Sequence, residues 1–79
     1  MHDVYVLQSE ANPDRFYIGS SCDTSRRLEE HNSGKSVHTN KHRPWRLIMS
    51  IGFADRSKAL RFETYLKSGS GRAFAKRHF

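Results

Sequence analysis

Apolar residues are concentrated in short runs bounded by polar turn residues, and this pattern predicts three β-strands. The first covers residues 3–8 and the second residues 16–20, both rich in β-branched and aromatic side chains. A third strand is expected over residues 46–53. The connection between the first two strands contains an Asn-Pro-Asp turn, so these strands should form an antiparallel hairpin.

The two-residue period of a strand sorts the side chains of this hairpin onto two faces. Tyr5 and Leu7 share one face of the first strand, and Tyr17 and Gly19 share one face of the second. If both tyrosines point to the same side, that face carries two phenols beside a glycine without a side chain. The opposite face is then expected to be apolar and to consist of Val4, Val6, Phe16 and Ile18.

Two further segments have the spacing of amphipathic helices. The first helix should begin near Asp23 or Thr24, either of which can cap its first amides, and end before residues 32–34, Asn-Ser-Gly. Asp55 should cap a second helix over residues 56–67. The apolar stripe of this second helix consists of Ala59, Phe62 and Leu66.

A short terminal helix over residues 70–79 would complete the order β-β-α-β-α-α. The expected fold class is therefore α+β, an α/β sandwich in which a small three-stranded antiparallel sheet is flanked by helices. With 79 residues, we expect residues 1–79 to form a single domain with a modest core. Residues 33–45 form a long basic loop, and loops of this length in small domains are often functional.

The charge of the chain is strongly one-sided. Its 14 lysine and arginine residues outnumber its 8 acidic residues, which gives a formal net charge of +6. No acidic residue occurs between Glu30 and Asp55, or after Glu63. A field of one sign suits a polyanion, and a nucleic-acid backbone is the commonest such partner. The simpler alternative is a basic protein without a specific partner.

Composition also bears on where the protein works. No apolar run approaches the ~20 residues that span a bilayer, and the N-terminus lacks the pattern of a secretory signal. The single cysteine, Cys22, cannot form an internal disulfide, which suits a reducing compartment. We therefore expect a cytoplasmic protein with no membrane association.

Several segments carry further motifs, namely Val4-Tyr5-Val6, Tyr17-Ile18-Gly19, Arg-Arg-Leu-Glu-Glu-His-Asn-Ser-Gly-Lys at 26–35, and residues 43–47 and 59–67. In their order and spacing these segments resemble the GIY-YIG nuclease superfamily, in particular its short, stand-alone bacterial members. The resemblance covers nearly the whole chain. Two departures are visible, since the first motif lacks its leading glycine and isoleucine, and Ser20 and Ser21 stand where some members have a lysine.

The resemblance implies a metal-dependent endonuclease and assigns its functional positions one at a time. These positions are Tyr5 and Tyr17 from the two motifs, Arg27 and His31 from the first helix, and Glu63 from the second helix. Glu63 is also the implied metal ligand. The expected products carry a 5′-phosphate and a 3′-hydroxyl.

These residue types suit phosphodiester hydrolysis. A free tyrosine has a pKa of about 10, so it needs nearby positive charge from Arg27 and a metal, with His31 able to accept its proton. Arg27 can fork onto the scissile phosphate. Glu63 can hold a single Mg²⁺ or Mn²⁺ together with water and phosphate oxygens. Whether Tyr5 or Tyr17 acts as the base stays open at this point.

Each position also has a purely structural interpretation. The two tyrosines suit an ordinary sheet, and Arg27 and His31 suit a solvated helix face. Glu63 in isolation is most often a surface residue. Zinc is disfavoured because Cys22 and the histidines lack paired ligand spacing. Trp45 at the start of a strand should belong to the core rather than stack on a base.

Nucleic-acid contacts are expected from the basic loop and from the end of the second helix. The residues predicted to make them are Lys35, His38, Lys41, His42, Arg43 and Lys67.

The leading functional hypothesis is an Mg²⁺- or Mn²⁺-dependent endonuclease that cuts DNA by a one-metal mechanism, acting on branched, nicked or single-stranded forms. The alternative is a non-catalytic nucleic-acid-binding module that retains the fold and shows salt-sensitive binding without turnover. A third possibility is a domain that depends on a protein partner for specificity. We expect a monomer or a weak homodimer, because a cut through both strands of DNA requires two active centres.

Overall fold

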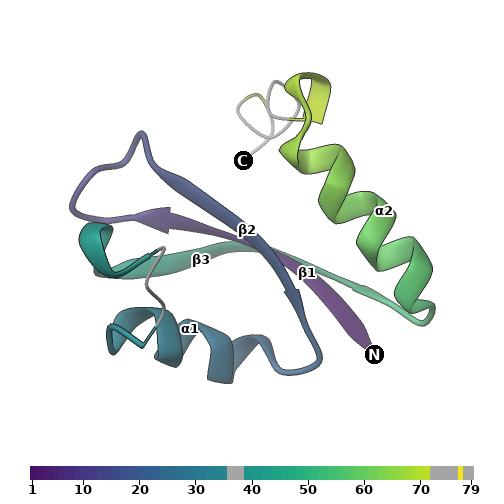
Figure 1. The fold of residues 1–79 in the computed structure, drawn as a ribbon, viewed down its shortest axis with the longest axis horizontal. Coiled ribbons are helices and arrows are strands. Elements are labelled where there is room, and N and C mark those ends of the chain that lie inside the picture. The colour runs from purple at the N-terminus through teal and green to yellow at the C-terminus, as the bar shows by residue number, and fades with distance from the viewer. Residues whose placement is uncertain (36–38, 72–76, 78–79) are drawn as a thin grey trace.

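The computed structural model describes residues 1–35, 39–71 and 77 (Figure 1). The element order is β1 (His2–Ser9), β2 (Phe16–Ser21), α1 (Thr24–Asn32), the short 3₁₀ helix η1 (Asn40–His42), β3 (Trp45–Phe53) and α2 (Arg56–Lys67). The predicted order of strands and helices is confirmed. Helical backbone occurs again at 69–71 and at 77, and the rest of the predicted terminal helix, with Phe74, lies outside the described residues.

The three strands form one antiparallel sheet in the order β2-β1-β3, so β1 lies in the centre. Its run Val4 to Leu7 is buried on both faces, because a central strand of a covered sheet needs apolar side chains pointing in both directions. In the register of the hairpin, Tyr5 lies opposite Gly19 and Leu7 lies opposite Tyr17. The predicted hairpin and the shared face of the two tyrosines are therefore confirmed.

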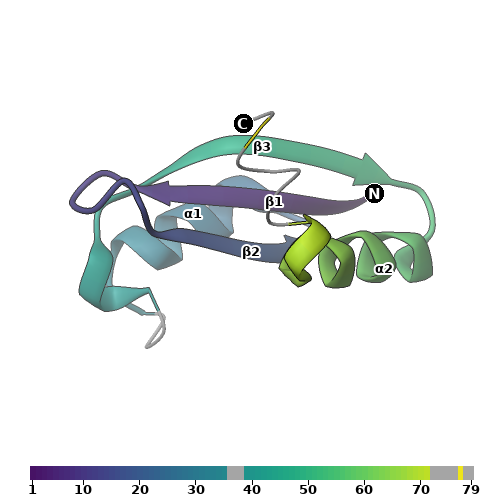
Figure 2. The same ribbon diagram turned by 90° about the horizontal axis from the view of Figure 1, so that it is seen from above.

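The two helices cover opposite faces of this sheet (Figures 1 and 2). On one face, α2 packs Ala59 and Leu66 against Val4 and Val6, as the predicted apolar stripe requires. On the other face, the buried cluster consists of Tyr5, Leu7 and Trp45, with Tyr17 and Leu28 packed against it. The prediction for Trp45 is confirmed. The register also places Phe16 on the predicted face with Val6 and Ile18, although its side chain at the start of β2 is 49% exposed.

Caps at the helix ends fix where the side chains of α1 and α2 point. Asp23 accepts a hydrogen bond from the amide of Arg26 at 3.1 Å, and Asp55 accepts one from the amide of Ser57 at 2.8 Å. Beyond the end of α1, Gly34 adopts a φ of +83°, which suits a residue without a Cβ. The predicted starts of both helices are confirmed. Within the described ranges, no helix is long and apolar enough to cross a membrane.

Candidate active site

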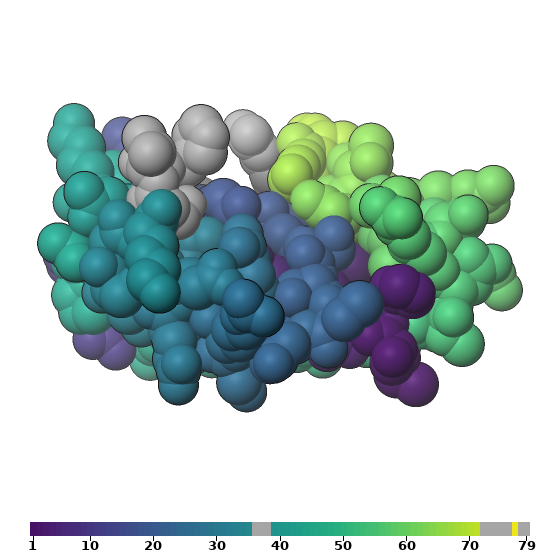
Figure 3. Space-filling model, turned by 60° about the horizontal axis from the view of Figure 1, so that its bottom comes forward, coloured from purple at the N-terminus to yellow at the C-terminus, as the bar shows by residue number. Residues whose placement is uncertain are grey.

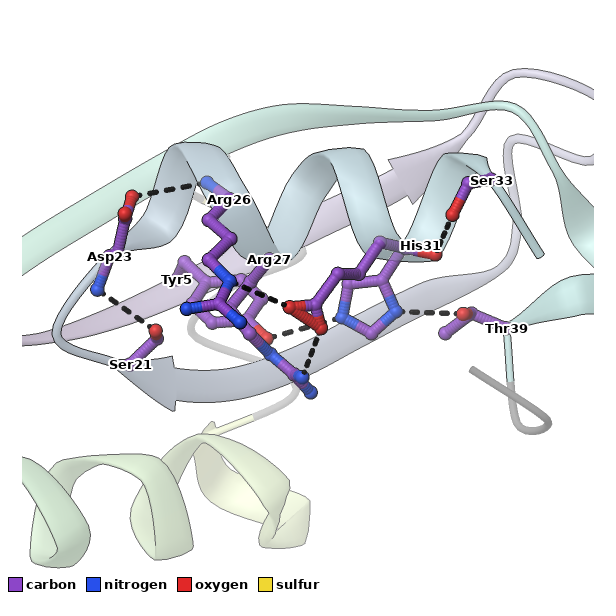
Figure 4. Close-up of polar contacts among 9 residues, drawn as sticks. Tyr5, Ser21, Asp23, Arg26, Arg27, His31, Ser33 and Thr39 are labelled. Atoms are coloured by element: carbon purple, nitrogen blue, oxygen red, sulfur yellow. Dashed lines mark hydrogen bonds and ion pairs between the residues drawn. The ribbon is translucent and has the colours of Figure 1, made fainter. Parts of the chain in front are cut away.

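Tyr5 and His31 come together beneath α1 (Figure 4), and Tyr17 packs against both rings. The hydroxyl of Tyr5 lies 3.2 Å from Nε2 of His31. The ring centroids of Tyr17 and His31 are 4.6 Å apart, and those of Tyr5 and Tyr17 are 6.3 Å apart. His31 is placed here because it lies four residues, about one turn, beyond Arg27 on the sheet-facing side of α1. Three residues that are far apart in the sequence therefore form one aromatic cluster.

Arg27 approaches the same cluster from α1. Its side chain is a hydrogen-bond partner of Tyr5, and this bond is the largest cause of the raised pKa of Arg27. The guanidinium also pairs with Glu30, with 3.0 Å between Nη1 and Oε2. Its neighbour Arg26 pairs with the same carboxylate at 3.4 Å, yet its side chain is 76% exposed against 38% for Arg27. Arg27 is thus the arginine that the helix directs toward the tyrosines.

Glu63 reaches the site from the other face of the sheet. The side chain of Ser20 in β2 points toward α2 and donates a hydrogen bond to Oε1 of Glu63 at 2.9 Å. Lys67 pairs with Oε2 at 2.9 Å. Because β2 is an edge strand, the carboxylate lies beside the open edge of the sheet, and its charge is close enough to raise the pKa of Tyr5. Glu63 therefore lies across the edge strand β2 from the cluster of Tyr5, Tyr17, Arg27 and His31, and not on the same face of the sheet.

The absence of a side chain at Gly19 makes room for Tyr5. A Cβ at this position would lie 2.6 Å from the Tyr5 hydroxyl oxygen and 3.0 Å from the Tyr17 ring. Real Cβ atoms are essentially never found so close to another heavy atom, so a larger residue would displace the phenol. The glycine of the Tyr-Ile-Gly motif is therefore required in this chain because the side chain of Tyr5 lies over β2 at this position.

Burial controls the chemistry of Tyr5. Its side chain is 1% exposed, and this burial raises its pKa, although the hydrogen bond from Arg27 acts in the opposite direction. The charges of Tyr17 and Glu63 raise the pKa further. Tyr5 is therefore protonated at neutral pH. Arg27 acts to lower the pKa of Tyr5, in the predicted direction, but the desolvation of the buried phenol outweighs it.

Exposure divides the site into two layers. Tyr5 and His31 are buried, at 1% and 0% exposed. Tyr17 is half-buried, and the side chains of Arg27 and Glu63 are 38% and 17% exposed. A substrate can reach the second group directly, whereas the first group lies behind it.

His31 should titrate at a lower pH than a free histidine. Burial lowers its pKa from 6.5, the positive charge of Arg27 lowers it further, and Glu30 acts in the opposite direction. Because the folded-state pKa is the lower one, the stability contributed by neutral His31 is present above pH 6.5 and is lost as the pH falls toward the folded-state value. A titration of the His31 ring protons by NMR should give a pKa below 6.5, and a value at or above 6.5 would contradict this environment.

The carboxylate of Glu63 is the group that could hold a divalent cation. Across residues 1–35, 39–71 and 77, no three His, Cys, Asp or Glu side chains gather in one place. A cation at Glu63 would therefore take most of its ligands from water and phosphate oxygens, which is the usual environment of Mg²⁺ in phosphate chemistry. Sγ of Cys22 lies 3.6 Å from Nδ1 of His2.

The predicted nucleic-acid contacts lie partly around this site. Lys35 and Lys41 are exposed, and Arg43 bonds to backbone carbonyl oxygens of Asn32 and Asn40. Lys67 is exposed and pairs with Glu63. His42 is half-buried, and His38 lies outside the described residues. The contacts of these residues with nucleic acid therefore stay predictions.

Two contacts of the site were not anticipated. Ser20 holds Glu63, although its position directly after the Tyr-Ile-Gly motif had drawn attention to it only as a missing lysine. Thr39 lies in the irregular loop, where nothing in the pattern of residues points to it, and its hydroxyl is 2.7 Å from Nδ1 of His31. Both residues hold others in place and carry no charge, which is why composition and spacing did not reveal them.

Comparison with known proteins gives a family match over almost the full length. The GIY-YIG catalytic domain matches residues 1–77. The chain is 42% identical over 69 residues to the structure-specific endonuclease subunit SLX1 of Scheffersomyces stipitis, a match that covers 78% of this chain and 20% of that relative. The same-named subunit of Meyerozyma guilliermondii is 40% identical over 72 residues, covering 84% of this chain and 24% of the relative. The chain thus spans only a fifth to a quarter of these fungal proteins.

Bacterial proteins of more similar length also match. A UPF0213 protein of Streptococcus pneumoniae is 39% identical over 67 residues, which covers 84% of this chain and 68% of that protein. The solution NMR structure of a UPF0213 protein from Bacillus halodurans has a TM-score of 0.57 and 32% sequence identity. That match covers 95% of this chain and 79% of the other. The similarity therefore extends to the fold as well as the sequence.

Proposed function

The chain belongs to the GIY-YIG catalytic domain family, and on this premise we propose that it is a metal-dependent endonuclease that hydrolyses phosphodiester bonds of DNA. The observation that carries the proposal is the meeting of a phenol, a guanidinium and a carboxylate, all accessible, around the open edge of β2. Phosphodiester hydrolysis needs an activated water, relief of charge on the phosphoryl oxygens and support for the leaving oxygen. The phenol can activate the water, the guanidinium can relieve charge on the phosphoryl oxygens, and a cation held by the carboxylate can support the leaving oxygen.

Exposure assigns different tasks to the two tyrosines. Tyr17 is the phenol that solvent and substrate can reach, so we assign its phenolate, formed by release of the phenolic proton to solvent, as the group that takes the proton from the attacking water. Tyr5 is buried and has a raised pKa, so we assign it as the group that holds Arg27 and His31. Arg27 then forks onto the scissile phosphate, where a planar guanidinium suits two phosphoryl oxygens.

Glu63 would hold a Mg²⁺ or Mn²⁺ ion. When bound, such an ion supplies charge stabilisation to the phosphoryl and leaving oxygens. Ser20 would keep Oε1 of the carboxylate in place, and Lys67 would neutralise the carboxylate in the absence of the cation. A single carboxylate is consistent with the proposed one-metal mechanism, because a two-metal centre usually draws on several acidic side chains.

The names of the fungal relatives inform the choice of substrate. Those relatives are structure-specific endonuclease subunits, and we propose that this chain likewise prefers branched or nicked DNA to intact duplex. The word subunit in their names is a reason to propose a protein partner for this chain too, which would add specificity. A cytoplasmic location, suggested by the single free and exposed Cys22, belongs to the same proposal.

The test is cleavage of a panel of end-labelled substrates, comprising intact duplex, nicked duplex, single strand, flap and four-way junction, with Mg²⁺, with Mn²⁺ and with EDTA. We expect cation-dependent cleavage of at least one branched or nicked form, and no cleavage by the Glu63→Ala variant purified in parallel. Equal cleavage by both proteins would reveal a contaminant and remove the claim.

The same panel distinguishes the alternative function. A non-catalytic nucleic-acid-binding module would bind these substrates in a salt-sensitive manner and cleave none of them with any cation. The accessible carboxylate of Glu63 disfavours that alternative, since binding of a phosphate backbone gains nothing from a negative charge beside it.

A further inference from the structure

Thr39 is the buried polar residue of the loop that lies against the site. Its side chain is 1% exposed, and its hydroxyl oxygen lies 2.7 Å from Nδ1 of His31 (Figure 4). His31 in turn is 0% exposed and contacts the Tyr5 hydroxyl through its other ring nitrogen. Both nitrogens of the imidazole are therefore engaged, one by a residue of the proposed active site and one by the loop.

The position of Thr39 is held by several bonds that do not involve His31. The indole of Trp45 donates to the carbonyl oxygen of Thr39 at 2.8 Å. Asn32, at the end of α1, bonds to both the amide and the carbonyl of Trp45. Ser9 donates to the carbonyl oxygen of His42 in the same loop at 2.6 Å. The fold thus fixes Thr39 from β1, α1 and β3, and the space-filling view shows this part of the chain packed against α1 (Figure 3).

The donors and acceptors of the buried layer select one tautomer of His31. Among the described residues, the hydroxyl of Thr39 has no hydrogen-bond partner other than Nδ1, and the hydroxyl of Tyr5 is within hydrogen-bond distance of Nε2. If Nδ1 carries the proton, Tyr5 donates to Nε2, and Nδ1 donates to Thr39. If Nε2 carries the proton, it donates to the phenol, and the phenol's own proton has no acceptor among the hydrogen bonds of the described residues. A phenol is a stronger donor than an aliphatic alcohol, so the first arrangement leaves the weaker donor unpaired and is favoured.

We propose that Thr39 is a positioning residue for the proposed nuclease site, because it accepts a hydrogen bond from Nδ1–H of His31 and so holds the tautomer whose Nε2 accepts from Tyr5. The inference rests on the proposed function. All donors then run in one direction, from Arg27 through Tyr5 and His31 to Thr39. The oxygen of Tyr5 keeps a lone pair toward Arg27, which holds the guanidinium in place for the phosphate.

The arrangement also connects the basic loop with the reacting groups. Lys41 and Arg43, which are predicted to contact the nucleic acid, follow Thr39 within four residues. A change in the loop conformation on binding DNA would therefore alter the position of the His31 ring through the buried hydrogen bond between Thr39 and His31. Buried partners that fix the tautomer and orientation of a functional histidine commonly change its performance by tenfold or more when they are removed.

The first test reads the tautomer directly. The ¹⁵N chemical shifts of the His31 ring, measured at pH 7.5 by long-range ¹H–¹⁵N NMR and assigned with a His31→Asn variant, should show a protonated Nδ1 and an unprotonated Nε2. Wild-type protein with the proton on Nε2 would overturn the proposal. This measurement needs neither DNA nor a cation, so its outcome is independent of whether the proposed nuclease activity exists.

The second test compares two substitutions of similar shape. Thr39→Val removes the acceptor, so the His31 proton should move to Nε2 and cleavage should fall by on the order of tenfold. Thr39→Ser keeps the hydroxyl and should retain the wild-type ¹⁵N pattern and most of the activity. Circular dichroism establishes that both variants are folded. An unchanged tautomer in folded Thr39→Val, or equal losses of activity in the two variants, would contradict the positioning role.

Discussion

Replacing Arg27 with alanine should lower the rate of DNA cleavage by on the order of 10²–10³-fold, which is typical for the loss of one group that stabilises the charge of a transition state. Arg27 interacts with Tyr5, and its side chain is half-buried. The neighbouring Arg26 is exposed and is not placed to supply the same positive charge to the phosphate. Single-turnover cleavage at saturating enzyme measures the loss without interference from product release.

Arg26→Ala is the matched control for this substitution. Arg26 precedes Arg27 on α1, carries the same charge and pairs with the same carboxylate of Glu30, but its side chain is directed into solvent. Removing it should weaken DNA binding slightly and leave the single-turnover rate close to that of the wild type. Similar losses of rate in the two variants would mean that charge on α1, and not the position of Arg27, is what the reaction requires.

Replacing Gly19 with alanine should lower both stability and activity. The added methyl group would lie 2.6 Å from the Tyr5 oxygen and 2.8 Å from the ring carbon that bears it, and Tyr5 is too buried to swing aside. We expect the free energy of unfolding in urea to fall by about 1–3 kcal/mol, as for other overpacked cores. A shift of Tyr5 would displace Arg27 and His31, so cleavage should fall by on the order of 10²-fold.

Gly69→Ala serves as the control, because nothing lies within 4 Å of a Cβ at that position. This variant should match the wild type in cleavage and be equal or slightly higher in stability, since alanine restricts the unfolded chain. Unchanged activity of Gly19→Ala in folded protein would show that the exact place of Tyr5 is unimportant.

Local signals in the sequence were sufficient for most of the fold. Asp23 and Asp55 start the two helices because their side chains accept hydrogen bonds from amides of the first turn. The central position of β1 agrees with its run of apolar residues, and the pairing of Tyr5 with Gly19 follows from the short hairpin. These features depend on neighbours in the chain, which a sequence shows directly.

Features that depend on packing between distant segments were harder to predict. Phe16 lies on the face that its period predicts, but its exposure of 49% at the start of the edge strand β2 did not follow from the period. Glu63 was expected beside the phenols, whereas it comes from the opposite face around the edge of β2. The burial that raises the pKa of Tyr5 likewise requires knowledge of α1 above it.

The central claim is that groups on two faces of the sheet act as one reaction centre around the edge of β2. A double-mutant cycle of Arg27→Ala and Glu63→Gln, followed by single-turnover cleavage, tests it most directly. Residues that act together on one transition state are strongly non-additive, so the double variant should cleave no more slowly than the slower single variant. Losses that multiply in the double variant would show two independent contributions and contradict a shared centre.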